Sequence, residues 1–187
     1  QGKKMSKSKG NVINPLDLTD KYGTDSLRMG LIVGNTPGTD LSLREDKIKG
    51  YKNNANKVGK IGRFVLYNTE KENLDGELNE QNKKLREEFD NFVKEISKEM
   101  DEYMYHVSAE KIYAYIWNRF ASEILEESKT IFQGEDEDAK NSRKVFLRTT
   151  YRDTLKVLHP FMPFVTEELW STSGFDGLLM TTSWPKV

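Results

Sequence analysis

Apolar side chains recur every three or four residues through most of the second half of this 187-residue chain. Residues 85–103, 112–125 and 145–158 each repeat them with the period of an amphipathic helix. No alternating pattern of strands and helices is long enough to predict a nucleotide-binding sheet. The sequence therefore predicts an all-α fold in which long antiparallel helices with short loops form a bundle.

Two shorter helices are expected ahead of this bundle. Asn14 is a good N-cap, Pro15 suits the first helical position, and Gly23 fits the stop after that helix. Thr24 is then expected to cap a second short helix that ends near Gly34.

Polar residues also mark where the longer helices should begin. Ser42 and Glu45 have the spacing of a capping box, with Ser42 at the N-cap and Glu45 at the third helical position. Asn79 and Ser108 are expected to cap two later helices. Residues 70–80 are polar and turn-rich, which indicates a linker between helices.

The helix expected after residue 42 carries a basic stripe opposite its apolar one. The apolar positions between residues 48 and 66 recur at helical spacing. The polar stripe includes Lys49, Lys52, Asn53, Asn56, Lys57, Lys60 and Arg63. Such a stripe can be a solvated surface or can contact a nucleic-acid backbone, and both interpretations remain open. Gly50, Gly59 and Gly62 weaken this helix by roughly 1 kcal/mol each relative to alanine, or allow close helix packing instead.

The formal net charge of −1 hides a strong asymmetry along the chain. Residues 1–63 hold 13 Lys and Arg against 6 Asp and Glu, whereas residues 64–138 hold 9 against 20. Residues 139–187 hold 7 against 4. We expect phosphate contacts in the first third and a solvated acidic face in the middle; the alternative is that both are ordinary charged helix surfaces.

A short run of lysines and serines lies near the N-terminus. Residues 4–8 read Lys-Met-Ser-Lys-Ser, and Gly10 follows two positions later. Ammonium groups, hydroxyls and the free amides of a glycine turn can hold a polyphosphate. Short Lys/Ser runs are also common in disordered tails, so composition alone leaves both interpretations open.

The order of these residues resembles the second signature of class I aminoacyl-tRNA synthetases. Residues 4–8 match its five positions, and residues 9–11 match the Lys-Gly-Asn extension of the valine/isoleucine/leucine subgroup. The resemblance implies a mobile loop that closes over Mg-bound ATP and consists of Lys4, Met5, Ser6, Lys7 and Ser8. It also implies that Lys7 is the catalytic residue, which stabilises the pyrophosphate leaving group while an aminoacyl-adenylate forms.

Later stretches extend the resemblance over essentially the whole chain. Residues 158–170, with Trp184 and Pro185, are similar to the end of the anticodon-binding bundle of the same subgroup. Residues 36–41 and 50–57 resemble its valine-specific members more than its isoleucine or leucine members. Isoleucine or leucine specificity is the alternative within the family.

The resemblance implies a division of the chain after residue 41. Residues 1–41 would hold the loop and a connector that touches the inner corner of the tRNA, and residues 42–187 would bind the anticodon arm. The residues of the basic stripe would then be candidate contacts to a tRNA, which we expect to be the tRNA for valine. A helical bundle that binds tRNA or protein without any link to catalysis is the alternative outside this family.

The sequence lacks the other class I signature, a His-x-Gly-His run, because its two histidines, His106 and His159, are 53 residues apart. We therefore expect the chain to be a piece of a longer protein whose catalytic domain is its partner. We also expect it not to form aminoacyl-adenylate by itself, which ATP–pyrophosphate exchange with valine would test.

Metal binding and membrane insertion are not expected. His106 and His159 have no partners at metal-ligand spacing, so we interpret both as structural and expect no bound metal. The chain has no cysteine, which suits a reducing compartment. No apolar run approaches the ~18 residues of a membrane-spanning helix. We expect a cytoplasmic monomer.

Overall fold

The computed structural model describes residues 4–36, 38–41, 43–70 and 76–187, the side chain of Lys7 excepted. Within these residues the regular elements are all helical and no strand forms, so the predicted all-α fold is confirmed. The α-helices are α1 (Pro15–Tyr22), α2 (Thr24–Ile32), α3 (Glu45–Asn68), α4 (Glu80–Asp101), α5 (Tyr105–Ala114), α6 (Leu125–Gln133), α7 (Glu137–Leu158) and α8 (Pro163–Thr172). A π-helix, Tyr115–Ile124, joins α5 to α6, and 3-10 turns lie at Lys7–Lys9 and Leu179–Thr181.

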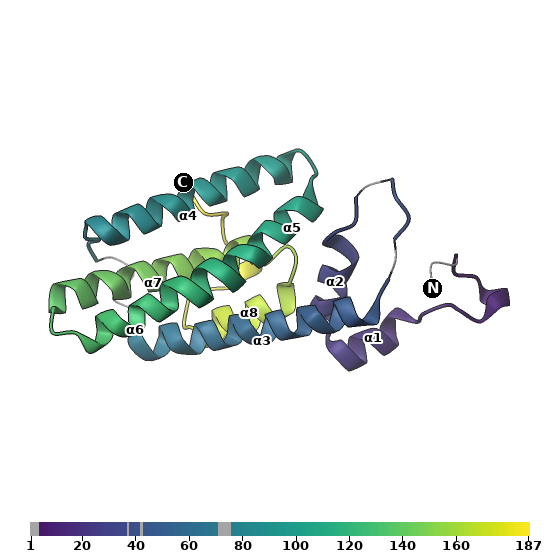
Figure 1. The fold of residues 1–187 in the computed structure, drawn as a ribbon, viewed down its shortest axis with the longest axis horizontal. Coiled ribbons are helices and arrows are strands. Elements are labelled where there is room, and N and C mark those ends of the chain that lie inside the picture. The colour runs from purple at the N-terminus through teal and green to yellow at the C-terminus, as the bar shows by residue number, and fades with distance from the viewer. Residues whose placement is uncertain (1–3, 37, 42, 71–75) are drawn as a thin grey trace.

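The long helices lie along one axis of the molecule. Figure 1 shows α3, α4, the rod formed by α5, the π-helix and α6, and then α7, each running opposite to the one before it. The shorter α8 contacts both α3 and α7. At one end of the bundle α1 and α2 pack against the start of α3, and the chain before α1 extends away from the bundle (Figure 1).

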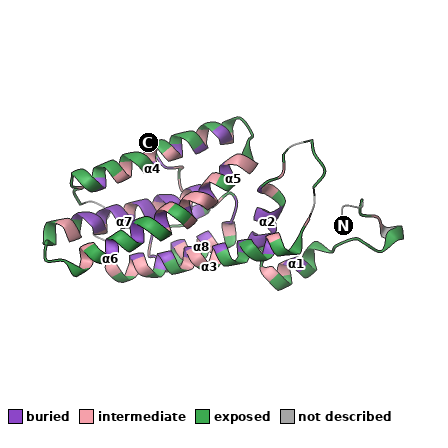
Figure 2. Ribbon diagram, viewed as in Figure 1, coloured by how far each residue is buried: buried purple, intermediate pink, exposed green. Residues whose placement is uncertain are grey.

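The apolar stripes meet in one core that runs from α2 to the C-terminal segment. Figure 2 shows the buried residues on the inner sides of the helices and the exposed ones on the outer sides. Fully burying one such side chain contributes about 1.5–3 kcal/mol, so the core is the main source of stability. A second, smaller cluster joins α1 and α2 to α3 and consists of Leu18, Leu27 and Ile48.

Both expected asparagine N-caps are confirmed. The Asn14 side chain accepts a hydrogen bond from the backbone N–H of Leu16 at 3.1 Å and begins α1. The Asn79 side chain accepts one from the N–H of Asn82 at 3.0 Å and begins α4. Each satisfies an amide that has no partner within its own helix.

The expected cap at Thr24 is wrong. Thr24 is the first residue of α2, and the N-cap is Gly23. Gly23 has φ +88°, a conformation that glycine adopts far more readily than other residues, and so α1 and α2 follow one another without a loop.

The expected cap at Ser108 is also wrong, because α5 begins three residues earlier, at Tyr105. Ser108 is buried inside α5, and its hydroxyl donates to the Glu99 carboxylate at 3.3 Å. The start of α3 differs as well: its first residue is Glu45 and its N-cap is Arg44, without a side-chain cap bond. The other half of the expected capping box, Ser42, lies outside the described residues.

The π-helix has a cause that can be read in the sequence. The buried residues Ile112, Ile116, Phe120 and Ile124 follow one another at intervals of four. An α-helix completes a turn in 3.6 residues, so this spacing would drift off one face, whereas the wider π turn keeps all four on the core side. The sequence predicted a helix here but did not distinguish its type.

A first prediction concerns Gly62, where α3 approaches α7 closely. A Cβ added at Gly62 would lie 2.3 Å from the hydroxyl oxygen of Tyr151, a fully buried side chain of α7. We expect Gly62→Ala to lower the free energy of unfolding by about 1–3 kcal/mol, because the two helices have to move apart. Urea unfolding of the purified chain measures this loss.

Gly59, three residues earlier on α3, supplies the matched control. A Cβ at Gly59 meets nothing within 4 Å. Gly59→Ala should therefore leave the free energy of unfolding unchanged or raise it by up to about 1 kcal/mol, through helix propensity. Equal effects of the two substitutions would contradict the close approach at Gly62.

Candidate nucleic-acid interface and phosphate loop

The lysine–serine run near the N-terminus forms a loop that is closed by Asn11. The Asn11 side-chain oxygen accepts a hydrogen bond from the N–H of Ser6 at 2.8 Å, and its nitrogen donates to the carbonyl of Lys4 at 3.3 Å. The hydroxyls of Ser6 and Ser8 are hydrogen-bonded at 2.6 Å. Gly10, at φ +61°, makes the turn that brings Asn11 back. Sequence reasoning assigned Asn11 no role in shaping the loop, although an asparagine beside a glycine in a polar run is a recognisable turn signal.

The loop offers groups that can bind phosphate, but it is open to solvent. The backbone of residues 7–9 forms a 3-10 turn in which the Lys9 N–H donates to the Ser6 carbonyl at 3.1 Å. Lys4, Met5 and Ser8 are exposed. Figure 1 shows the loop projecting away from the bundle. Ammonium and hydroxyl groups so placed can hold a polyphosphate once another part of the protein covers the loop and excludes water.

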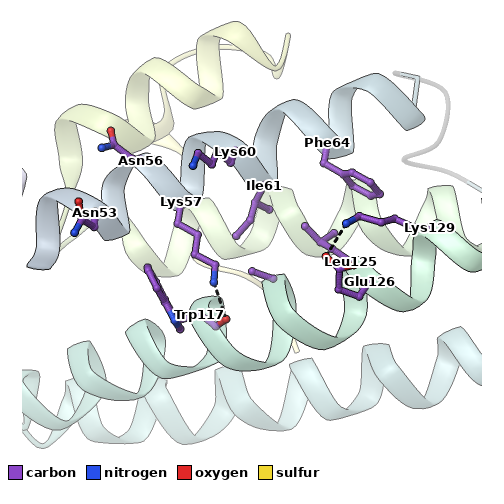
Figure 3. Close-up of a pocket in the computed structure, with 11 residues that line it drawn as sticks. Asn53, Asn56, Lys57, Lys60, Ile61, Phe64, Trp117, Leu125, Glu126 and Lys129 are labelled. Carbon is purple, nitrogen blue, oxygen red and sulfur yellow. Dashed lines mark hydrogen bonds and ion pairs between the residues drawn. The ribbon is translucent and has the colours of Figure 1, made fainter.

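A groove lies between α3 and the π-helix with the start of α6, and we call it the basic groove. Its volume is about 630 Å³. It is lined by Asn53, Asn56, Lys57, Lys60, Ile61, Phe64, Trp117, Ala121, Leu125, Glu126 and Lys129. Figure 3 shows the side chains of the two asparagines and of Lys60 along α3, on one side of the groove. Two ring systems, three ammonium groups and two amides in one groove suit a ligand with phosphates and planar bases.

Lys57 is held inside the groove by Trp117. Its ammonium nitrogen lies 3.8 Å from the centre of the Trp117 ring and donates to the Trp117 carbonyl at 3.3 Å (Figure 3). The Trp117 ring is stacked on Tyr113, with centroids 5.9 Å apart and planes 10° apart. The same carbonyl accepts from the Ser122 hydroxyl at 2.9 Å, five residues ahead in the π-helix. A positive charge is thus fixed at the floor of the groove.

The structure brings four of the seven stripe residues together in the groove: Asn53, Asn56, Lys57 and Lys60. The other three do not line it. Lys49 and Arg63 are exposed elsewhere on α3. Lys52 is also exposed, and its ammonium donates to the carbonyl of Lys21 at 3.0 Å, which ties α3 to α1.

Sequence reasoning missed two groups of the opposite wall, Trp117 and Lys129. Trp117 was assigned to an apolar stripe at helical spacing, and Lys129 lies in the acidic middle of the chain. Lys129 is paired with Glu126 at 2.6 Å within α6. No signal in the sequence could have matched these residues to α3, because the wall forms only when the π-helix packs beside it.

Acidic residues in the middle of the chain form ion pairs across the bundle surface. Arg119 of the π-helix pairs with Glu88 of α4 at 2.7 Å and with Glu123 at 2.5 Å. The hydrogen bond to Glu88 is the main reason that the pKa of Arg119 is raised above its ordinary value. These pairs are partly exposed, so each contributes little stability.

The two histidines lie apart. His159 Nδ1 is hydrogen-bonded to the Thr166 hydroxyl at 2.8 Å, and burial lowers the pKa of its imidazole. His106 is half-buried at the start of α5. Among the residues that the structure describes, no three His, Asp or Glu side chains gather as metal ligands. None of the helices in this part of the chain is long and apolar enough to span a membrane.

Two family models match this sequence. Residues 82–187 match the anticodon-binding domain of tRNA ligase, and residues 1–44 match the class I tRNA synthetases for I, L, M and V. The valine–tRNA ligase of Pelagibacter ubique is 40% identical over 197 aligned residues, which cover 99% of this chain and 22% of that protein. The valine–tRNA ligase of Bacillus subtilis is 37% identical over 193 residues, covering 100% of this chain and 22% of that protein. The chain thus spans about a fifth of the length of the curated relatives it matches.

Solved structures share the fold. The agnB2 LeuRS of Agrobacterium radiobacter K84, in a ternary complex with tRNA and LeuAMS, has a TM-score of 0.76 at 20% identity and covers 98% of this chain and 22% of that one. The methionyl-tRNA synthetase of Mycobacterium tuberculosis bound by methionyl-adenylate has a TM-score of 0.70 at 24% identity, over 89% of this chain and 35% of that one. At these identities the likeness concerns the arrangement of helices.

Proposed function

This chain belongs to the family of the anticodon-binding domain of tRNA ligases, and from that premise we propose that it is the part of a valine–tRNA ligase that binds the anticodon arm of the tRNA for valine. The whole ligase, here called the parent ligase, would join valine to this tRNA at the expense of ATP through an aminoacyl-adenylate. The basic groove is the observation that carries the proposal. It brings together Lys57, held against the Trp117 ring, the two amides of Asn53 and Asn56, and two ring systems, which together suit a nucleic-acid ligand.

Residues 4–8 would serve the parent ligase as the ATP loop. Lys7 would stabilise the charge that develops on pyrophosphate as the adenylate forms, and Lys4, Ser6 and Ser8 would shape the loop. The Asn11 hydrogen bonds support this assignment, because they pre-shape the loop before any ligand is present. ATP would arrive with Mg²⁺ bound to its phosphates.

The catalytic domain of the parent ligase is the partner proposed for residues 1–41. Large apolar side chains are exposed in this segment, among them Val12, Ile13, Leu16 and Leu31. Exposed apolar side chains that gather in one region mark an interaction surface. We propose that the catalytic domain covers these side chains and also covers the ATP loop, so that water is excluded from it. We further propose that the ligase acts as a monomer in the cytoplasm.

A second prediction tests the groove through Lys60, which is exposed on its α3 side. We expect Lys60→Gln to weaken binding of the tRNA for valine and to reduce the slope of log affinity against log salt by about one, because one phosphate contact is lost. Fluorescence anisotropy of this chain with labelled tRNA, over a salt series, measures both.

Lys94 gives the matched control, since it is exposed on α4, which lies across the bundle from α3 in Figure 1, and its substitution makes the same charge change. Lys94→Gln should leave affinity and salt slope unchanged. Equal salt slopes for Lys60→Gln and Lys94→Gln would contradict the proposal that the tRNA binds in the basic groove. The same assay with the tRNAs for isoleucine and leucine decides between valine and the two other specificities that the family offers.

A further inference from the structure

Two side chains of α2 bind the backbone of the corner between α7 and α8, one at the end of α7 and one at the start of α8. The Asp25 carboxylate accepts hydrogen bonds from the N–H groups of Phe164, at 3.2 Å, and Val165, at 2.7 Å, in the first turn of α8. One turn further along α2, the Arg28 guanidinium donates to the carbonyls of Pro160, at 2.8 Å, and Phe161, at 3.3 Å, just after the end of α7. We call these four hydrogen bonds the α2 clamp.

The clamp is chemically matched to the backbone groups it holds. The first N–H groups of a helix and the carbonyls that follow a helix end have no partner within their own helix. A carboxylate and a guanidinium satisfy them, and hydrogen bonds to charged groups are the stronger kind. Asp25 is only 7% exposed, and burial is the main reason that the pKa of its carboxyl is raised. An apolar residue in place of the buried Asp25 could not accept these two N–H groups and so could not hold the start of α8 against α2.

A set of contacts leads from the clamp to α1, the helix that directly follows the loop. Leu18 of α1, Leu27 of α2 and Ile48 of α3 pack together and lock α1 onto α2. At the end of α1, the Tyr22 hydroxyl donates to the Glu45 carboxylate at 2.7 Å, and Lys21 forms an ion pair with the same carboxylate. Since α1 is fixed to both α2 and α3, the point at which residues 4–13 leave the bundle depends on how α2 lies against α3.

We propose that Asp25 and Arg28 are positioning residues, which fix the direction of the ATP loop relative to the tRNA-binding bundle by clamping the α7–α8 corner. The inference rests on the proposed function, because it assumes that the loop acts in adenylate formation. It adds that the bundle, through α7 and α8, sets where the loop stands. Without the clamp α2 keeps its apolar contacts but loses the polar bonds that define its angle.

The first test is a distance measurement on this chain, which has no cysteine of its own. Spin labels on cysteines introduced at Leu16 and Tyr67, exposed at 69% and 89%, report α1 against the far end of α3. Asp25→Ala should broaden the distance distribution. Asp20→Ala, which removes an exposed carboxylate from α1, should leave it narrow. Equally narrow distributions overturn the proposal.

The second test uses the parent ligase and its valine-dependent ATP–pyrophosphate exchange. Asp25→Ala should lower kcat by about 10- to 100-fold, as misplacement of a loop by roughly 1 Å does, while tRNA affinity stays unchanged. Asp25→Asn, which retains one acceptor, should recover part of the rate. If kcat stays at the level of Asp20→Ala although the distances broaden, or if kcat and tRNA affinity fall together, the clamp is structural only. An unmodified parent without exchange would contradict the proposed function instead, and the distance measurement would still decide on the clamp.

Discussion

Lys7→Ala in the parent ligase is expected to slow valine-dependent ATP–pyrophosphate exchange by about 100- to 1,000-fold, the usual effect of removing one group that stabilises transition-state charge. Pyrophosphate gains charge as it leaves, and we propose that Lys7 of the loop stabilises this charge. The tRNA affinity should remain unchanged, because the basic groove lies on α3 and the π-helix, away from the loop.

The control for this substitution is Lys9→Ala, which removes the same charge from the same 3-10 turn. Its effect on exchange should be much smaller if Lys7 has a specific role. Equal losses for the two variants would mean that the loop acts only through its overall positive charge. A loss of tRNA binding that matches the loss of exchange would contradict the assignment of Lys7 to the chemical step.

Asp153→Ala is expected to lower the free energy of unfolding by about 3–5 kcal/mol, because it removes the buried anion shared by three partly buried cations, of which Arg86 keeps its ion pair with Asp90 at 2.8 Å. Asp153 is buried in α7 and pairs with Arg86 of α4 at 2.7 Å and with Arg152 at 3.0 Å. Lys156 lies 3.9 Å away, and burial lowers the pKa of its ammonium while Asp153 opposes that shift. Urea unfolding of the purified chain measures the loss.

Asp101, exposed in the last turn of α4, gives the comparison for Asp153. Asp101→Ala should change the free energy of unfolding by no more than about 0.5 kcal/mol, as surface substitutions usually do. A loss below about 1 kcal/mol for Asp153→Ala would mean that water reaches the cluster and screens its charges.

The helices could be predicted from the sequence because their signals are local. The apolar period and a polar residue at the helix start both act within a few residues, and so Asn14 and Asn79 were identified as caps correctly. The predicted caps at Thr24 and Ser108 were wrong, because backbone conformation at one position and a tertiary contact at the other outweighed the local capping preference. Gly23 could take the positive φ that the turn needed, and Ser108 found a partner in Glu99, on the preceding helix.

The candidate site was predictable to the extent that it lies on one helix. The stripe residues of α3 share a side because helical spacing puts them there, but spacing could not tell which of them would line a groove. That depends on Trp117 of the π-helix and Lys129 of α6, which lie more than 50 residues further along the chain. The α2 clamp was unpredictable for the same reason, since Asp25 and Phe164 are 139 residues apart.

That separation has a consequence for the order in which the protein is made. A ribosome that adds about 5–20 residues per second completes α2 on the order of ten seconds before the amides of α8 exist. During that interval α1 and α2 can collapse onto the start of α3 through Leu18, Leu27 and Ile48. Their final angle is set only when Phe164 and Val165 emerge. A nascent chain halted before this point contains both the ATP loop and the basic stripe, but the orientation of one relative to the other is not yet fixed.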